Sequence, residues 1–300
     1  MRPRSFSLLA RAVMTVCIFG AMLAPLASAD GLNSFAVLAG STVKNAGAGV
    51  LGATTITGNM GVSPGTACTL FVAGTGCTLG PGMVTGTVDL GNAVSLAAQN
   101  ELTTLFNTES TLPTTASISG GVLTGLSLGP GVYAVGAGTL AGTLTLSDGG
   151  VPGSIFVFEL SSLTTSPGSS INVVGLSPGD SLYWVDTSSA TLGDNTVFFG
   201  NILASTSISF DPGATDLCGR ALAETGEVSF AGQDATSGIE NQVSIGCVGT
   251  PGAGGSGFNG LTGTGTGPTP EPATLLLLGS GFAGSFIRKV RTKRAKARRA

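Results

Sequence analysis

The chain has 300 residues, of which 49 are glycine and only 10% are charged. Globular proteins contain about 7% glycine and about 25% charged residues, so this composition excludes a helical enzyme and a charged disordered chain. Residues 30–270 contain fifteen acidic residues against two basic ones, Lys44 and Arg220. Such an acidic body repels phosphate backbones, so no nucleic-acid partner is expected.

The first 29 residues have the layout of a secretory signal peptide. A basic start precedes an apolar run over 12–26, and Ala27-Ser-Ala29 follows. These small residues predict cleavage by signal peptidase just before Asp30. The apolar run is shorter than the ~20 residues that a membrane-spanning helix needs, so a membrane span is the weaker alternative. We therefore expect an exported protein.

Residues 270–300 contain Pro270-Glu271-Pro272, an apolar stretch over 273–287 and a tail with eight basic residues. These three parts resemble the PEP-CTERM sorting signal of Gram-negative bacteria. The resemblance implies processing by an exosortase, with release to, or attachment at, the outer cell surface. A short apolar segment followed by positive charge can insert transiently in a membrane, and a permanent tail anchor is the alternative.

Four cysteines remain after removal of the signal peptide, at positions 68, 77, 218 and 247. In an exported protein four cysteines favour disulfides, and three pairings are possible. We expect Cys68–Cys77, which brackets a short loop, and Cys218–Cys247, which would hold the end of the body. A metal site is the alternative, but the chain has no His and no Cys-x-x-Cys, so no metal or cofactor is expected.

The body, residues 30–247, is joined to the sorting signal by a Gly/Thr-rich linker over 248–269, which predicts a flexible tether. Segments of the body repeat a polar Ser/Thr strand, a glycine turn and an apolar strand at intervals of about 19 to 27 residues. For example, GNILA at 200–204 is echoed by GRALA at 219–223. Strands linked by such turns predict a β-helix, whose coils bury their apolar sides against each other.

One segment, 89–109, breaks this pattern because it is rich in alanine and lacks proline. It predicts a single helix packed along the β-helix. An apolar stripe at helical spacing would face the coils, with Glu101 inside it; its members are Leu90, Ala93, Val94, Ala97 and Leu105. The irregular insert just before it, residues 68–82, would cap one end of the stack, where open strand edges invite aggregation.

Side chains alternate between the two sides of a strand, so polar residues next to core residues are expected to point outward. Ile208 and Phe210 are expected in the core, for example, which turns the serines around them to the surface. The same alternation gives one outer surface of hydroxyl and methyl groups, formed by Thr42, Thr55, Thr57, Thr143, Thr145, Thr164, Thr191, Ser205, Ser207 and Ser209.

The order of these pieces resembles the DUF3494 family of ice-binding proteins. The resemblance extends from 35 to 223 and includes FAVLAGSTVKN (35–45), TTITGNMGVSPG (54–65), GSIFVFEL (153–160) and SSATLGDNTVFFGNILA (188–204). It implies an irregular right-handed β-helix of triangular section with one long α-helix alongside, and adsorption to ice that inhibits recrystallisation. On physical grounds, we expect the outer hydroxyl and methyl groups to hold an ordered layer of water that merges with the crystal.

The sequence departs from this family at two points. Some active relatives repeat a T-A/G-x-T/N motif, to which Thr124-Gly-Leu-Ser127 is only a near match. In addition, Lys44 places a charge beside Thr42 on the outer surface, where it would disturb a flat face.

The composition and fold class leave two other functions to consider, catalysis and a structural role at the cell surface. An enzyme acting on polysaccharides would need clustered carboxylates, whereas Asp148, Glu159, Asp186 and Asp194 are scattered singly, so catalysis is not expected. The alternative to ice binding is a surface or biofilm-matrix protein of the same fold, which would bind exopolysaccharide or self-associate. The sorting signal fits either of these two functions.

Overall fold

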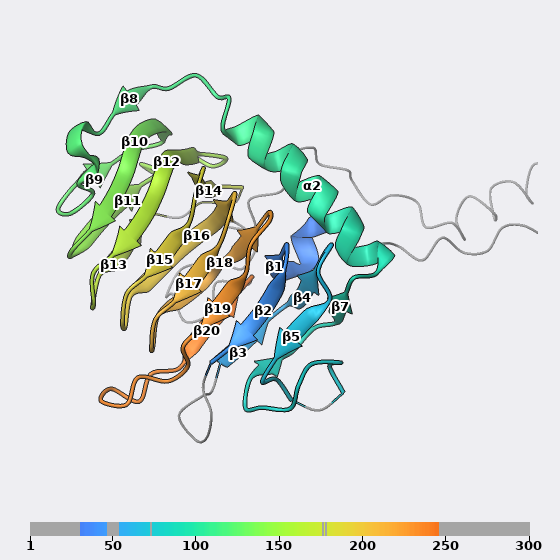
Figure 1. Ribbon diagram of the computed structural model, residues 1–300. Helices are drawn as coiled ribbons and strands as arrows, with labels where there is room; N and C mark the ends of the chain where they lie inside the picture. Colours follow the sequence, from blue (N-terminus) through green and yellow to red (C-terminus); the bar gives the residue numbers. More distant parts are fainter. Residues whose placement is uncertain (1–30, 47–53, 73, 176, 178, 246–300) are drawn as a thin grey trace, which may run out of the picture. The chain divides into compact units, whose positions relative to one another are not determined.

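A computed structural model of the chain describes residues 31–46, 54–72, 74–175, 177 and 179–245 (Figure 1). These residues contain twenty strands joined by parallel pairing, and a helix, α2 (Ala93–Glu109), that lies alongside them. The expected fold class, a mainly β solenoid with one packed helix, is confirmed. The signal peptide, Cys247, the linker and the sorting signal lie outside the described residues.

Equivalent strands of successive coils pair with each other and form three faces. The covered face lies under α2, and the other two faces, the hydroxyl face and the mixed face, are named by their outward side chains. In order of pairing, the covered face comprises β8 (Ala116–Ser117), the first parts of β10 (Gly131–Leu140) and β12 (Ile155–Thr165), β14 (Ser181–Asp186), the second parts of β16 (Val197–Ala204) and β18 (Thr215–Ala223), β1 (Phe35–Ala39), β4 (Asn59–Val62) and β7 (Val88–Leu90).

The other two faces are assembled in the same way. The hydroxyl face comprises the second parts of β10 and β12, then β15 (Ala190–Leu192), β17 (Ile208–Phe210), β19 (Val228–Phe230), β2 (Thr42–Asn45) and β5 (Ala67–Thr69). The mixed face comprises β9 (Ser127–Leu128), β11 (Thr143–Ser147), β13 (Ser170–Val174), the first parts of β16 and β18, β20 (Asn241–Ser244), β3 (Thr54–Thr57) and β6 (Met83–Val84).

The order of the coils in space differs from their order in the chain. Strands β1, β2 and β3 pair with β18, β19 and β20, so the first coil of the body stacks directly on the last. From there the chain continues to β7 at one end of the stack. Helix α2 then runs back along the stack, and the chain resumes at β8 and the short 3-10 helix η2 (Ser119–Gly121) near the opposite end (Figure 1).

The similar segments GNILA (200–204) and GRALA (219–223) lie one coil apart in the stack. GNILA and GRALA pair in register, with Ile202 opposite Ala221 and Leu203 opposite Leu222. Inside the stack, side chains of neighbouring coils lie on each other. The rings of Phe158 and Trp184 stack with their centroids 4.2 Å apart. Apolar burial of this kind is the main favourable contribution to folding.

Helix α2 starts four residues later than expected, at Ala93, because residues 88–90 continue the parallel ladder as β7. Asn92 caps the helix, and its side-chain oxygen accepts the N–H groups of Val94 and Ser95 at 3.0 and 2.9 Å. Such a cap satisfies backbone donors that have no partner within the helix.

The predicted stripe of the helix is displaced by about one residue from its buried side chains, although two of its members, Val94 and Leu105, are half-buried and pack against the strands. Ala93 is exposed, and the buried side chains of α2 are those of Ser95, Ala98, Gln99, Leu102 and Phe106. Glu101 lies outside that stripe. Its exposed carboxylate accepts the N–H of Leu32 at 2.8 Å and so anchors the 3-10 helix η1 (Leu32–Ser34) to α2.

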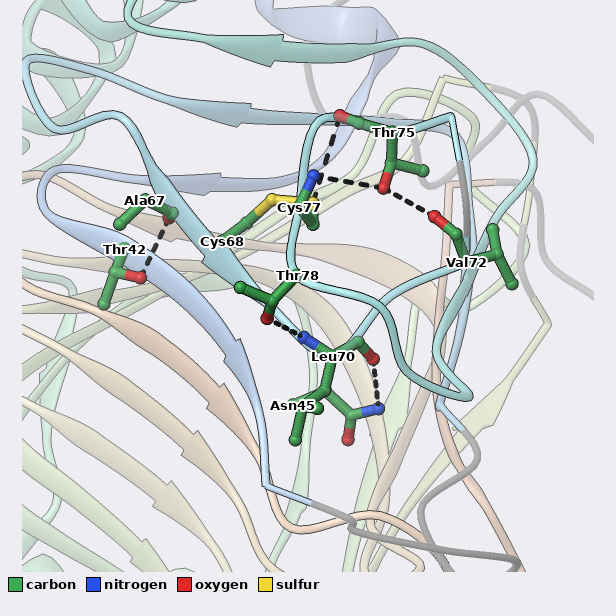
Figure 2. Close-up of a disulfide and its surroundings, with 9 residues drawn as sticks. All are labelled: Thr42, Asn45, Ala67, Cys68, Leu70, Val72, Thr75, Cys77 and Thr78. Atoms are coloured by element: carbon green, nitrogen blue, oxygen red, sulfur yellow. Dashed lines mark hydrogen bonds between the residues drawn. A yellow bond between two sulfur atoms is a disulfide. The ribbon is translucent and has the colours of Figure 1, made fainter.

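The insert at 68–82 begins in β5 at the end of the hydroxyl face, and hydrogen bonds such as that from the N–H of Leu70 to Thr78 Oγ1 connect its described residues (Figure 2). Cys68 and Cys77 form the predicted disulfide, with their Cα atoms 4.8 Å apart. Phe71 is fully buried in the core, and its N–H donates to the carbonyl of Thr78 at 3.0 Å. Cys218 is also disulfide-bonded, while its predicted partner, Cys247, lies outside the described residues.

Candidate functional site

The covered face is sealed by α2. Its outward side chains and those of the helix form one apolar cluster, in which Leu102 and Phe106 of the helix join Val185, Leu203 and Leu222 of the strands. All of these side chains are buried. The central strands of the covered face therefore stabilise the fold and are closed to a ligand by α2.

The mixed face is open but uneven. Strands β13 and β16 meet there through the pair Ser170–Val197, so the regular ladder is interrupted between these coils. Among the residues of its strands, Thr215 and Ser244 are buried, whereas Val197 and Met83 expose apolar side chains. Buried polar residues and exposed apolar residues thus alternate along this face without a regular pattern.

The hydroxyl face repeats one tetrapeptide pattern. The first and third residues point outward, and the second points into the core; the fourth is buried in every copy except ACTL. The copies are TVKN (42–45), ACTL (67–70), AGTL (137–140), SLTT (162–165), SATL (189–192), SISF (207–210) and EVSF (227–230).

The outward side chains form two parallel rows along the stack. In spatial order, row 1 consists of Ala137, Ser162, Ser189, Ser207, Glu227, Thr42 and Ala67. Row 2 consists of Thr139, Thr164, Thr191, Ser209, Ser229, Lys44 and Thr69. No register shift falls within these seven strand segments, whereas the covered face has a shift between β1 and β4. The shifts in the β10–β12 and β16–β18 pairs lie at the corners between faces.

The two rows have the dimensions of a regular grid. Paired strands lie about 4.8 Å apart and alternate residues of a strand about 6.6 Å apart. Hydrogen bonds hold several of the hydroxyl groups in place. Ser207 Oγ accepts the N–H of Glu227 at 3.2 Å, Ser229 Oγ donates to Ser209 Oγ at 3.1 Å, and Thr42 Oγ1 donates to the carbonyl of Ala67 at 2.9 Å (Figure 2).

The structure divides the ten predicted surface residues between faces, so they do not form one surface. Five lie in the two rows of the hydroxyl face: Thr42, Thr164, Thr191, Ser207 and Ser209. Four lie on the mixed face: Thr55, Thr57, Thr143 and Thr145. Ser205 lies at the turn between β16 and β17, where its N–H donates to the carbonyl of Asp186 at 2.8 Å.

Sequence reasoning missed half of the hydroxyl positions in the rows. They are Thr69, Thr139, Ser162, Ser189 and Ser229. The signal that could have found Ser229 is the likeness of EVSF to SISF, twenty residues earlier. Thr139 precedes Leu140 in the same way that Thr191 precedes Leu192.

Two buried charged groups, Arg220 and Asp216, lie on β18, which contributes no segment to the hydroxyl face. Arg220 is buried beneath η1, where its Nη1 donates to Asn201 Oδ1 and its Nη2 to the carbonyl of Asn33, both at 2.8 Å. Burial lowers the pKa of Arg220 to about 10. Burial likewise raises the pKa of Asp216, on the same strand, well above its usual value. Arg220 thus links the first coil to β16, and both charged side chains are buried.

The described part of the chain contains no cluster of three or more His, Cys, Asp or Glu side chains that could hold a metal ion. No helix in that part is long and apolar enough to cross a bilayer. What the described surface presents to a ligand is the regular array of small hydroxyl side chains on the hydroxyl face.

Comparison with known proteins agrees with this arrangement. Residues 37–236 match the family described as Ice-binding-like, and residues 268–291 match the PEP-CTERM protein-sorting motif. An ice-binding protein of Nostoc sp. (strain HG1) is 40% identical over 200 residues, which cover 66% of this chain and 69% of that relative.

Solved structures of ice-binding proteins share the fold. One from an Antarctic Biological Consortium superposes with a TM-score of 0.60 at 35% identity, over 71% of this chain and 87% of the other. One from the Antarctic ascomycete Antarctomyces psychrotrophicus gives a TM-score of 0.59 at 29% identity, over 72% and 97%. By sequence and by fold, this chain belongs to the Ice-binding-like family.

Proposed function

We propose that this protein is exported and adsorbs to ice through its hydroxyl face, thereby inhibiting ice growth or recrystallisation. The observation that carries the proposal is row 2, in which hydroxyl side chains occupy six of seven positions on strands paired without a register shift. The relatives' names supply the ligand class, since they specify ice and none specifies exopolysaccharide.

The rows suit an ordered water surface for two physical reasons. The grid of about 4.8 by 6.6 Å repeats along the stack, so water molecules held by one rung are held in the same way by the next. Threonine has a stiff χ1, so little side-chain entropy is lost when its methyl and hydroxyl groups meet a solid surface. The hydrogen bonds of Ser207, Ser209 and Ser229 fix further positions of the array.

Adsorption at such a face opposes crystal growth without any chemical step. Molecules bound to the ice surface force the crystal to grow as curved fronts between them, and a curved front melts more readily than a flat one. No proton transfer, metal ion or cofactor takes part in this mechanism. We accordingly propose a non-enzymatic role.

The ends of the chain supply the route to the outside. We propose that signal peptidase removes residues 1–29, and that an exosortase processes the sorting signal at 270–300 after its apolar segment has inserted transiently in a membrane. The body at 30–247 would then reach the surface or surroundings of a Gram-negative cell, with 248–269 as a tether. The match to the sorting motif at 268–291 supports this route.

A matched pair of variants tests the ice-binding face. Thr191→Tyr places a bulky ring in the middle of row 2, and Thr145→Tyr places the same ring on the mixed face; both native side chains are partly exposed. We expect Thr191→Tyr to raise the protein concentration needed to inhibit recrystallisation at least about tenfold, a loss of ~1.4 kcal/mol of binding free energy. Thr145→Tyr should leave that concentration unchanged.

Circular dichroism and thermal unfolding of both variants serve as the check that the fold is intact. Equal loss of activity in the two variants, or in neither, would exclude the hydroxyl face as the ice-binding face. A wild-type protein that does not partition into growing ice would exclude ice binding altogether.

A further inference from the structure

The hydroxyl face is not uniform along its length. Its first four rungs, from 137–139 to 207–209, carry only Ala, Ser and Thr in both rows. The next two rungs each carry a charge: Glu227 in row 1 and Lys44 in row 2. The last rung, Ala67 and Thr69, is again uncharged. The two charges therefore separate a long uncharged segment from a short one.

Both charged side chains lie within the array of the hydroxyl face. Lys44 is paired with Ser229 on one side and Thr69 on the other, and it is exposed. Glu227 precedes the buried Val228, so alternation turns it to the same side as Ser229. Each therefore occupies a position that a hydroxyl fills on most other rungs.

A charge at such a position opposes the contact that the other rungs allow. The ammonium group of lysine is compact and strongly hydrated, and a carboxylate also loses favourable hydration when it leaves bulk water. These groups orient nearby water around their own charge and not along the grid. Lysine and glutamate are also longer than serine and threonine, so they stand above the surface formed by their neighbours.

We propose that Glu227 and Lys44 confine ice contact to the four uncharged rungs and thereby limit the ice-binding activity of this protein. This inference rests on the proposed function of the hydroxyl face. Four rungs at about 4.8 Å extend roughly 14 Å, and all seven would extend roughly 29 Å. Removal of the two charges would thus about double the length of the contact surface.

The test is a gain of activity. Lys44→Thr combined with Glu227→Ser restores hydroxyl side chains in both rows without changing the net charge. Since the uncharged length about doubles, we expect the concentration that inhibits recrystallisation to fall at least about twofold, with greater thermal hysteresis at equal concentration. Both substitutions are at strand surface positions, where Thr and Ser are tolerated.

The matched control is the charge exchange Lys44→Glu with Glu227→Lys, which keeps both charges on the face. It should show no gain. The inference is overturned if the wild-type protein binds ice and the neutral double variant is no more active, or if the charge exchange gains as much as the neutral variant; the proposed function stands in both cases. If neither the wild-type protein nor the neutral variant binds ice, the proposed function fails and the inference with it.

Discussion

Strand β12 passes through both the covered face and the hydroxyl face, yet its two halves have different surroundings. Val157, in the first half, is fully buried in the cluster formed with α2. Thr164, seven residues later, is exposed. The backbone pairing is parallel in both halves, so the outward side chains alone decide whether a face receives a helix or remains open. Packing of the helix and the proposed contact with ice therefore involve different halves of the same strand.

The largest expected effect comes from the contact between α2 and the covered face. Leu102→Ala removes a fully buried side chain, and a loss of about 3 kcal/mol in the free energy of unfolding is expected from the cavity and the lost burial. Urea unfolding followed by circular dichroism measures this change. The control is Leu96→Ala in the same helix. Leu96 is 51% exposed, so this substitution should change the free energy of unfolding by less than about 0.5 kcal/mol. Equal effects would contradict the packing of α2.

The disulfide at the end of the hydroxyl face gives the next effect. Replacing Cys68 and Cys77 together by serine opens a loop with a sequence separation of nine residues, and a loss of about 2.5 kcal/mol is expected. Ice activity should fall little, because the rung at Ala67 and Thr69 lies beyond the two charged rungs. Unfolding of both proteins without reductant measures the stability change. A complete loss of ice activity in the folded variant would show that the last rung is essential.

A pH dependence distinguishes the interior from the hydroxyl face. Because burial raises the pKa of Asp216 above its usual 3.8, the folded protein holds this proton more tightly than the unfolded chain does. Its stabilising contribution is complete below about pH 4 and is lost as the pH rises through the folded-state pKa. Asp216→Asn removes this dependence, so the stability of the variant relative to the wild type should increase from pH 4 to pH 8.

Urea unfolding at each pH follows the stability difference, and recrystallisation assays at the same pH values follow ice binding. The ice activity of Asp216→Asn should match that of the wild type throughout, because Asp216 is fully buried and has no place in either row. A stability difference that stays constant with pH would contradict the raised pKa.

The smallest effect concerns the start of α2. Asn92→Ala removes the cap, and a loss of about 1 kcal/mol in unfolding free energy is expected without any change in ice activity. Asn100→Ala, at an exposed position inside the helix, is the matched control and should be neutral or slightly stabilising, since alanine has the higher helix propensity. A destabilisation of Asn100→Ala equal to that of Asn92→Ala would argue against the cap.

Sequence alone predicted which side chains enter the core. Ile208 and Phe210 are buried, as alternation requires, because a strand covered on one side shows a period of two residues. The alternation of polar and apolar residues shows which side chains point outward, but it does not predict to which of the three faces a strand belongs. For that reason Thr143 and Thr164 were assigned to one surface, although they lie on the mixed face and the hydroxyl face.

Two other features had weak or no local signals. The stripe of α2 was misplaced because Leu90 looks like a helical residue, whereas its pairing with Val62 makes it part of a strand. The stacking of the first coil on the last depends on contacts such as Val37 with Ala221, between segments that are far apart in the chain. Such long-range pairing leaves no trace in a local pattern of hydrophobicity.

The contact between the first and last coils joins segments that are far apart in the chain. Strands β1, β2 and β3 pair with β18, β19 and β20, and at this junction Lys44 lies opposite Ser229 on the hydroxyl face. Contacts of such high sequence separation slow folding. Deletion of the last coil would leave β1, β2 and β3 without pairing partners on that side.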